Sequence, residues 1–589
     1  MRAWARLCTG ILVLAAASGA PSRAEACGGT FCDQGPPGQP PMPVDQTGEN
    51  VLFVMQDGWV EAHIQIQYQG DPARFAWIIP VPVEPELSVG SQVLFTNLLN
   101  GTVPTFTTTT SFQLCASDDG SAQGSSFGCA MSSSQDSAGG SYVPGAGGSG
   151  GTNSNAPVVV GREAVGNFEA LTLKPVDAKG MLDWLVQNKY DTDQADAEPI
   201  LKDYIDRKYV FVALKLQPNA GVDEIHPIVV RYKGTEPCVP LKLTRIAAVE
   251  DMTVRTFFLG DQRVVPTGGY KHVTLNSARF DWAGLGQNYS LAITRAVDSP
   301  TANGRAFVTE YAGPSAAVTS AGISQTNWDG AVLKTLDPES VLARLSAWNL
   351  LSCYSAATCE SPHPLVFPLL EKYLPPPAGV QPGQYYSCLS CYPEADKSAW
   401  SADALGNDFD ELIADPAQHA TELLFDNVYL TRMVTRISPS EMTEDPMFRE
   451  WPESLPDVSN QLSADRQTRC DGYLMTTTSD GREVAGTSAP GDLPVELPWA
   501  STVEEYTASG EHVVLVDNGK KIDSMLSAYN HEVAPETLPS ATSASRLGSE
   551  TNTACGCALP AKRSTPSLAF AVLALLGWLR RAGRARVHR

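Results

Sequence analysis

A two-residue turn signal, Asp57-Gly58, lies between two runs of strand-forming residues near the start of the chain. The run before it is VLFVMQ, and the run after it alternates apolar and polar residues from Ala62 to Tyr68. An Asp-Gly pair between such runs predicts a β-hairpin, because the turn needs residues that tolerate positive φ. Regular alternation also predicts one buried and one solvated face. We therefore expect an antiparallel sheet here, with His63 exposed to solvent on its polar face.

Later segments predict more strands with short helices between them. FAWIIPVPVEP indicates an edge strand, because Pro80 and Pro82 cannot donate hydrogen bonds to a neighbouring strand. Strand-like runs then alternate with short helices, and Asp177 is placed to cap one of these helices. The expected fold class is α+β: a β-rich, mostly antiparallel sheet with inserted helices, plus a more helical cysteine-containing region, all stabilised by disulfides.

The helical region predicts two clear helix starts. Asp337 followed by proline is a typical N-terminus, and the sequence SPSE at residues 438–441 has the form of a capping box. Composition divides the whole chain into seven segments. They are a signal peptide (1–26), an arm with a β-rich segment (27–115), a low-complexity linker (116–157), an α+β segment (158–335), the helical segment (336–480), an extended segment and stalk (481–554) and a sorting tail (555–589).

The N-terminus has the pattern of a secretory signal peptide. Two arginines precede a short apolar stretch, and small residues surround a cleavage point after Ala26. The alternative is lipoprotein processing at Cys27. We expect signal peptidase to cleave after Ala26.

The C-terminal tail predicts attachment to a membrane. An apolar run from Pro566 to Leu579 is roughly 21 Å long as a helix, shorter than a hydrocarbon core of roughly 30 Å. Five arginines follow, and such residues stay on the cytoplasmic side. The body is therefore expected outside the inner membrane, at the outer membrane or cell surface, joined to the tail by a Ser/Thr/Pro-rich stalk.

Cysteine usage agrees with export. Ten of the 13 cysteines lie outside the signal peptide and the tail, and an even number in an oxidising compartment predicts disulfides. A zinc site built from the four cysteines between residues 353 and 391 is the alternative, although their spacing is irregular. The disulfide candidates are Cys27, Cys32, Cys115, Cys129, Cys238, Cys353, Cys359, Cys388, Cys391 and Cys470.

Few residues indicate catalysis. The densest group of acids with a histidine is Asp408, Asp410, Glu411 and His419, which could act as acid and base, although an exposed acidic loop before a helix has the same composition. We expect no cofactor and no metal. The formal net charge of −23 disfavours a nucleic-acid partner, because the protein and the phosphates would repel each other.

Two resemblances add to this interpretation. Cys555-Gly556-Cys557, the apolar run and the arginine cluster resemble the MYXO-CTERM sorting tails of myxobacterial surface proteins. That resemblance implies cleavage by a sorting protease and modification of Cys555 or Cys557. The stretches ACGGTFC, VDQTGENVLFV, AHIQIQYQGDPARFAWIIPVP, LDWLVQNKY and YLTRMVTRISPSEMTEDPMF, between about residues 26 and 480, resemble domain-of-unknown-function family number 2330. This second resemblance implies a protein of the cell envelope, and it assigns no catalytic residue to this chain.

The sequence thus predicts an exported, surface-tethered binding or structural protein of the cell envelope, with an unidentified ligand. The alternative is a secreted hydrolase that uses carboxylates or a divalent metal.

Overall fold

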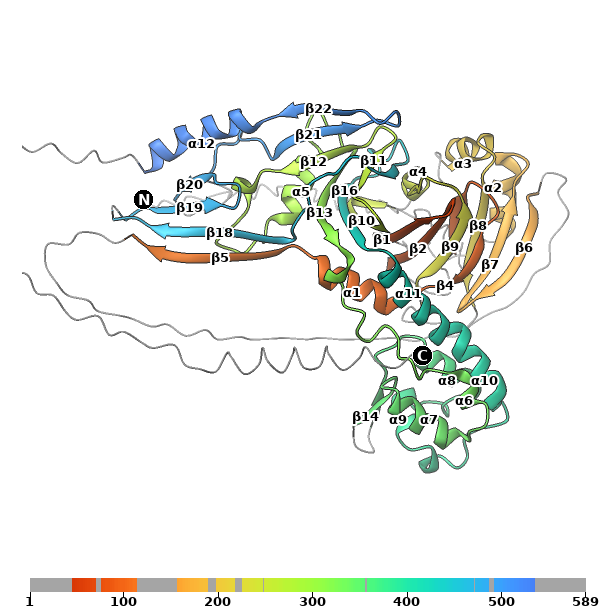
Figure 1. Cartoon of the computed structure of the whole chain (residues 1–589). Coiled ribbons are helices and arrows are strands. Elements are labelled where there is room, and N and C mark those ends of the chain that lie inside the picture. The colour runs from red at the N-terminus through yellow and green to blue at the C-terminus, as the bar shows by residue number, and fades with distance from the viewer. Residues whose placement is uncertain are drawn as a thin grey trace, which may run out of the picture. The chain divides into compact units, whose positions relative to one another are not determined.

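The computed structural model describes residues 45–69, 76–113, 156–188, 197–217, 225–246, 248–354, 358–470, 472–486 and 492–534. Within them, mixed and antiparallel sheets are combined with inserted helices, which confirms the α+β prediction (Figure 1). The predicted signal peptide, most of the linker, most of the stalk and the sorting tail lie outside the described residues, as do Cys27, Cys32, Cys115, Cys129, Cys555 and Cys557.

The largest sheet has ten strands, and most neighbours are antiparallel. Only the pairs β1–β10 and β12–β13 are parallel among the described strands of this sheet. From one edge to the other the order is β22 (His512–Asp517), β21 (Ala500–Tyr506), β12 (Lys271–Leu275), β13 (Ala306–Pro314), β16 (Tyr429–Ile437), β10 (Ala248–Gly260), β1 (Asp45–Gln56), β2 (Trp59–Gln69), β9 (Ile228–Lys233) and β4 (Glu86–Val89).

The predicted hairpin is confirmed at the position of its turn. Gln56 pairs with Trp59, so Asp57 and Gly58 form a two-residue turn, with φ of 53° and 76°. Positive φ at both positions is the reason why Asp and Gly occur there.

A second sheet packs on the large one. Its order is β3 (Ala76–Val81), β8 (Val210–Leu216), β7 (Phe168–Lys174) and β6 (Val158–Val165), so β3 is an edge strand, as Pro80 predicted. Phe53 of β1, Trp77 of β3 and Val212 of β8 belong to one buried core. The other face of this sheet is covered by α2 (Ala178–Gln187) and α3 (Ala197–Asp206). Asp177 caps α2 as expected, accepting a hydrogen bond from the Gly180 N–H.

Two of the helices on the other face of the large sheet pack over β1. They are α1 (Gln92–Thr102) and α11 (Asp415–Asp426), and both contribute leucines to a core that contains Leu52 and Val54 of β1. This face is the one to which β2 directs its polar residues, because neighbouring residues of a strand point to opposite faces. Because α11 lies over this face, polar side chains of β2 are covered by the helix instead of facing solvent.

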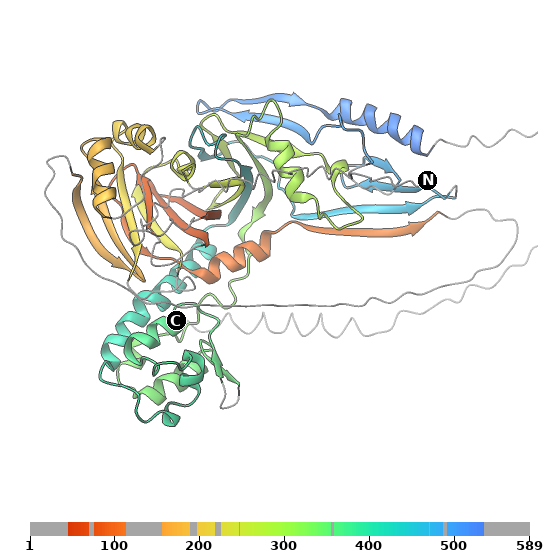
Figure 2. The same ribbon diagram turned by 180° about the vertical axis from the view of Figure 1, so that it is seen from behind.

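A helical segment is inserted between the adjacent strands β13 and β16. It contains α6 (Gly330–Leu333), α7 (Pro338–Ala347), the small hairpin of β14 (Ser352–Tyr354) and β15 (Thr358–Glu360), α8 (Val366–Tyr373), α9 (Pro382–Ser387), α10 (Ala402–Phe409), a π-helical turn (Asp410–Ala414) and α11. Asp337 caps α7, which confirms that predicted helix start. In both ribbon views, α11 runs from this helical group to the large sheet (Figures 1 and 2).

The C-terminal part of the described chain is more ordered than composition suggests. A third sheet contains β5 (Thr105–Phe112), β18 (Gln461–Thr468), β19 (Leu474–Thr478) and β20 (Glu483–Ala485), and α12 (Gly519–Val533) packs against β20. Residues 481–533 were expected to be extended, yet they supply strands of two sheets and a helix. The smaller elements are α4 (Leu241–Thr244), α5 (Tyr289–Val297) and the pair of β11 (Val264–Thr267) with β17 (Met447–Glu450).

Two disulfides form among the four candidate cysteines of the helical segment. They join Cys353 to Cys359 and Cys388 to Cys391, so these four sulfurs are not available as zinc-binding thiolates. Cys470 is disulfide-bonded as well. Cys238 was wrongly predicted to be bridged. It is a free cysteine that pairs with Met447 in an isolated antiparallel β-bridge, and burial together with the charge of Asp445 raises the pKa of its thiol.

The predicted capping box at residues 438–441 begins no helix. Half of its hydrogen bonding is present, since the Ser438 N–H donates to Glu441 Oε2 at 2.8 Å. The Ser438 hydroxyl instead accepts from the Asp251 N–H at 3.1 Å, so it does not cap a helical turn. The segment is a turn between β16 and β17.

No described helix is both long and apolar enough to cross a membrane.

Candidate functional site

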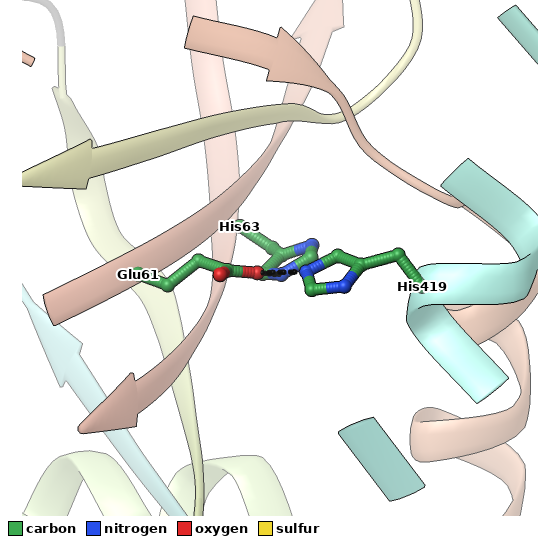
Figure 3. A group of neighbouring side chains, drawn as sticks. All are labelled: Glu61, His63 and His419. Carbon is green, nitrogen blue, oxygen red and sulfur yellow. Dashed lines mark hydrogen bonds and ion pairs between the residues drawn. The ribbon is translucent and has the colours of Figure 1, made fainter. Parts of the chain in front are cut away.

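Glu61, His63 and His419 converge on the covered face of the large sheet. Glu61 and His63 lie two residues apart on β2, and His419 comes from α11 (Figure 3). Glu61 Oε1 is 2.7 Å from His63 Nε2 and 2.5 Å from His419 Nε2. The two imidazole rings stack, with centroids 6.0 Å apart and planes inclined by 18°. One carboxylate oxygen therefore bridges two imidazoles.

His63 is buried rather than solvated, which corrects the sequence-based expectation. The residue is only 1% exposed. The same face carries a chain of amides in which Asn50 donates to Gln65 and Gln65 donates to Gln92 of α1, at 2.7 and 2.8 Å. Alternation correctly predicted which residues share a face, but the polar face is covered by helices.

The three groups differ in their access to solvent. The side chains of His63, Glu61 and His419 are 2%, 13% and 43% exposed. Nδ1 of His63 is buried, and it makes no hydrogen bond within the described residues. His419 lies at the outer side of the group, where a bound species can exchange with solvent.

The charges of the group depend on its hydrogen bonds. Burial alone would raise the pKa of Glu61, but the hydrogen bonds from His419 and His63 outweigh it and hold that pKa below its ordinary value. The hydrogen bond to Glu61 raises the pKa of His419, against the opposing effect of burial. The carboxylate is therefore ionised at neutral pH.

The donor set fits a divalent transition metal ion. The two imidazole nitrogens and the carboxylate oxygen all lie within 4.8 Å of one another. Ligand atoms around tetrahedral zinc are about 3.3 Å apart, given bonds of about 2.0–2.1 Å. To admit an ion, the two N···O distances must lengthen by less than about 1 Å, and the two imidazole nitrogens must also come to about 3.3 Å from each other.

A pocket of about 620 Å³ opens beside the group. Glu61 and His419 both line it, together with Trp59 and Arg231. The Arg231 guanidinium lies over the Trp59 ring at 4.1 Å from its centroid and pairs with Glu86 at 2.6 Å. Through Glu61 and His419, the group is accessible from this pocket.

A family model described as "Uncharacterized protein conserved in bacteria (DUF2330)" matches residues 21–329, just over half of the chain. The chain belongs to this family. The comparisons with curated proteins and with solved structures found no match. Glu61 and His63 lie in the part that matches the DUF2330 model, whereas His419 lies beyond it.

Of the acid-histidine group predicted from the DUF2330 protein's sequence, only His419 belongs to this site. Asp408 Oδ2 accepts from Lys372 Nζ at 2.6 Å and from the Tyr373 hydroxyl at 2.7 Å. Asp410 accepts from the Gly330 N–H at 2.6 Å, at the start of α6. These two carboxylates join helices to each other, and Glu411 is exposed.

Sequence reasoning missed Glu61 and misjudged His63. The signal was present, because an acid and a histidine two residues apart on a strand must share a face. Nothing local indicates that a helix more than 350 residues later covers that face and adds the second imidazole.

Proposed function

We propose that this chain is an exported, surface-tethered protein of the cell envelope and that it binds a divalent transition metal ion through Glu61, His63 and His419. The convergence of three ligand atoms within 4.8 Å carries the metal-binding part of the proposal. Two imidazoles and one carboxylate favour ions such as Zn²⁺ over Ca²⁺ and Mg²⁺, which prefer oxygen ligands.

The site is suited to binding because its donors come from separate, well-packed elements. β2 lies in the interior of the large sheet, and α11 is fixed by Leu423 and Leu424 in the core beneath it. An ion would exchange two hydrogen bonds to Glu61 Oε1 for three coordination bonds. The imidazoles would then use the nitrogens that now donate to that oxygen.

The metal-binding proposal is tested by titrating Zn²⁺ into the chelator-treated mature protein in a calorimeter. We expect one equivalent to bind, and we expect Glu61→Gln and His419→Ala each to weaken binding at least about tenfold. His531→Ala, on the exposed side of α12, is the matched control and should bind as the wild type does. Unchanged affinity in both site variants would refute the proposal.

The export proposal is supported by the patterns at the two ends of the chain and is consistent with the disulfides of the helical segment. In it, signal peptidase cleaves after Ala26, and a sorting protease of the myxobacterial MYXO-CTERM type processes the tail at Cys555 or Cys557. We expect Cys555→Ala with Cys557→Ala to move the protein from the surface fraction to the medium or the inner membrane. Retention at the surface would count against sorting at this motif.

A second candidate function is metal-dependent hydrolysis. One observation favours it: Glu61 and His419 line a pocket of about 620 Å³, which would give a substrate access to an ion held by them. Asp57, Glu86, Glu422 and Asp426 line the same pocket, so the substrate would be uncharged or cationic. Cleavage of the uncharged ester p-nitrophenyl acetate by the zinc-loaded protein, lost in Glu61→Gln, would support it. Stoichiometric zinc without turnover would leave binding as the function.

A further inference from the structure

A second pocket, of about 530 Å³, lies between the large sheet and the segment that leads into β18. Its wall is largely apolar and includes Phe280, Tyr289, Val308, Leu455 and Leu462. Pockets of about 300–1,000 Å³ with apolar walls and a few polar groups are typical small-molecule sites. It shares no lining residue with the pocket beside Glu61.

Glu504 lines this pocket and has two histidine partners. Glu504 Oε2 is 3.2 Å from His272 Nδ1, and Glu504 Oε1 is 3.6 Å from His512 Nε2. Tyr506 stacks on His512, with ring centroids 4.6 Å apart. Glu504 is thus held in a network with both histidines.

The other two lining carboxylates are also paired. Glu310 Oε2 is 2.6 Å from Arg432 Nε, and both side chains are only 3% exposed. Asp480 forms an ion pair with Arg482, which also contacts Asp523. Each carboxylate that lines the pocket therefore has a basic partner other than Arg263, which is the remaining arginine of this pocket.

Arg263 is a buried guanidinium that makes no direct ion pair among the described residues, and the charges of Glu504 and Asp457 act on it only from beyond ion-pair distance. It is 8% exposed, and its Nη1 donates to the Pro456 carbonyl at 2.8 Å. Its Nη2 donates to the Thr309 hydroxyl at 3.3 Å and lies 3.5 Å from His272 Nε2, while its Nε has no hydrogen-bond partner. Burying an unpaired charge is costly, and a guanidinium cannot lose its proton at physiological pH.

We propose that this pocket binds a small organic acid, with the ligand's carboxylate on Arg263 and its aromatic or aliphatic body against the apolar wall. The carboxylate supplies the direct ion-pair partner that the guanidinium lacks. The apolar wall selects against inorganic anions, because they have no surface to bury there. This site is independent of the metal site.

The test uses phenylacetate and its neutral counterpart phenylacetamide, titrated into the mature wild-type protein. We expect phenylacetate to bind at one site at least about tenfold more tightly than phenylacetamide, the effect of a charge-assisted hydrogen bond. In Arg263→Gln we expect this preference to disappear. Arg207→Gln is the matched control: this arginine, which directly follows α3, pairs with Asp203 and Asp445, lies outside the pocket, and its loss should leave the preference intact.

Two outcomes would overturn the proposal. One is equal binding of acid and amide, or saturable binding of neither, by the wild-type protein. The other is a preference for the acid that survives in folded Arg263→Gln. The wild-type comparison uses no variant, so it decides the matter even if Arg263→Gln fails to fold.

Discussion

At the scale of single residues, the environment of a polar side chain depended on contacts that no local pattern contains. Alternation along β2 correctly separated its apolar residues from His63. It could not show that α11 lies over that face, because His419 follows Glu61 by 358 residues. Asp408 and Asp410 show the converse, since both are near His419 in sequence and both hold helices together instead.

Two other histidines, His226 and His363, are buried as neutral imidazoles, so acid should destabilise the fold by protonating them. Burial lowers the pKa of His226 to about 4, against an ordinary value of 6.5. Burial lowers the pKa of His363 to about 4 as well, with a smaller effect from the charge of His226. Both histidines bind protons more readily in the unfolded chain. Their contribution to stability is therefore complete above about pH 6.5 and falls as the pH drops toward 4.

We predict that the free energy of unfolding decreases by roughly 3 kcal/mol for His226 alone between about pH 6.5 and 4. Urea unfolding across this range measures the decrease. His226→Gln should show a shallower decrease, because glutamine does not take up a proton in this range. Its amide can still accept from the Asn167 N–H and donate to the Pro227 carbonyl, which preserves the local fold. Parallel curves for the two proteins would contradict the assignment.

At the scale of elements, the features with short-range signals were predictable and their long-range pairing was not. The Asp57-Gly58 turn, the Asp177 cap and the Asp337 cap each depend on a few neighbouring residues, and each is present. The sequence SPSE has the same kind of signal but forms only a turn, because the Ser438 hydroxyl bonds to the Asp251 N–H instead. Cys238 is likewise a case where a long-range contact decides the outcome: it pairs with Met447 and is a free cysteine.

The disulfide that closes the β14–β15 hairpin should stabilise the helical segment modestly. Cys353 and Cys359 are six residues apart, so their bond restricts only a short loop of the unfolded chain. We predict that Cys353→Ser with Cys359→Ser lowers the free energy of unfolding by about 2 kcal/mol. Denaturant unfolding with and without reductant measures it, and Cys238→Ala should leave the effect of reductant unchanged. A reductant effect of the same size in the double variant would contradict this assignment.

At the scale of the whole molecule, strands from distant parts of the chain complete one sheet. β16 lies between β13 and β10, with the helical segment inserted before it. The match to the DUF2330 model ends at residue 329, before β16 begins. The matched region by itself thus lacks an interior strand of the largest sheet. Sequence patterns predicted β1, β2 and β3 but assigned residues 429–437, which form β16, to the helical segment. A strand order built from such distant pairs is set by tertiary packing.

We predict that a fragment of residues 27–329 does not fold, because β13 and β10 each lose a partner and the core loses Met433 and Ile437. A fragment of residues 27–536 should fold and serves as the control. Circular dichroism and cooperative urea unfolding distinguish the two. Cooperative unfolding of the shorter fragment would show that the sheet can form without β16.

The separation of Glu61 from His419 also determines when the site can exist. A chain that crosses a membrane unfolded has its first two ligands on the far side long before the third emerges. The three side chains come together only when α11 docks on the sheet. In the exported, metal-binding protein that we propose, the ion would therefore come from the compartment in which folding finishes, and the occupancy of the site would report the metal content of that compartment rather than that of the cytoplasm.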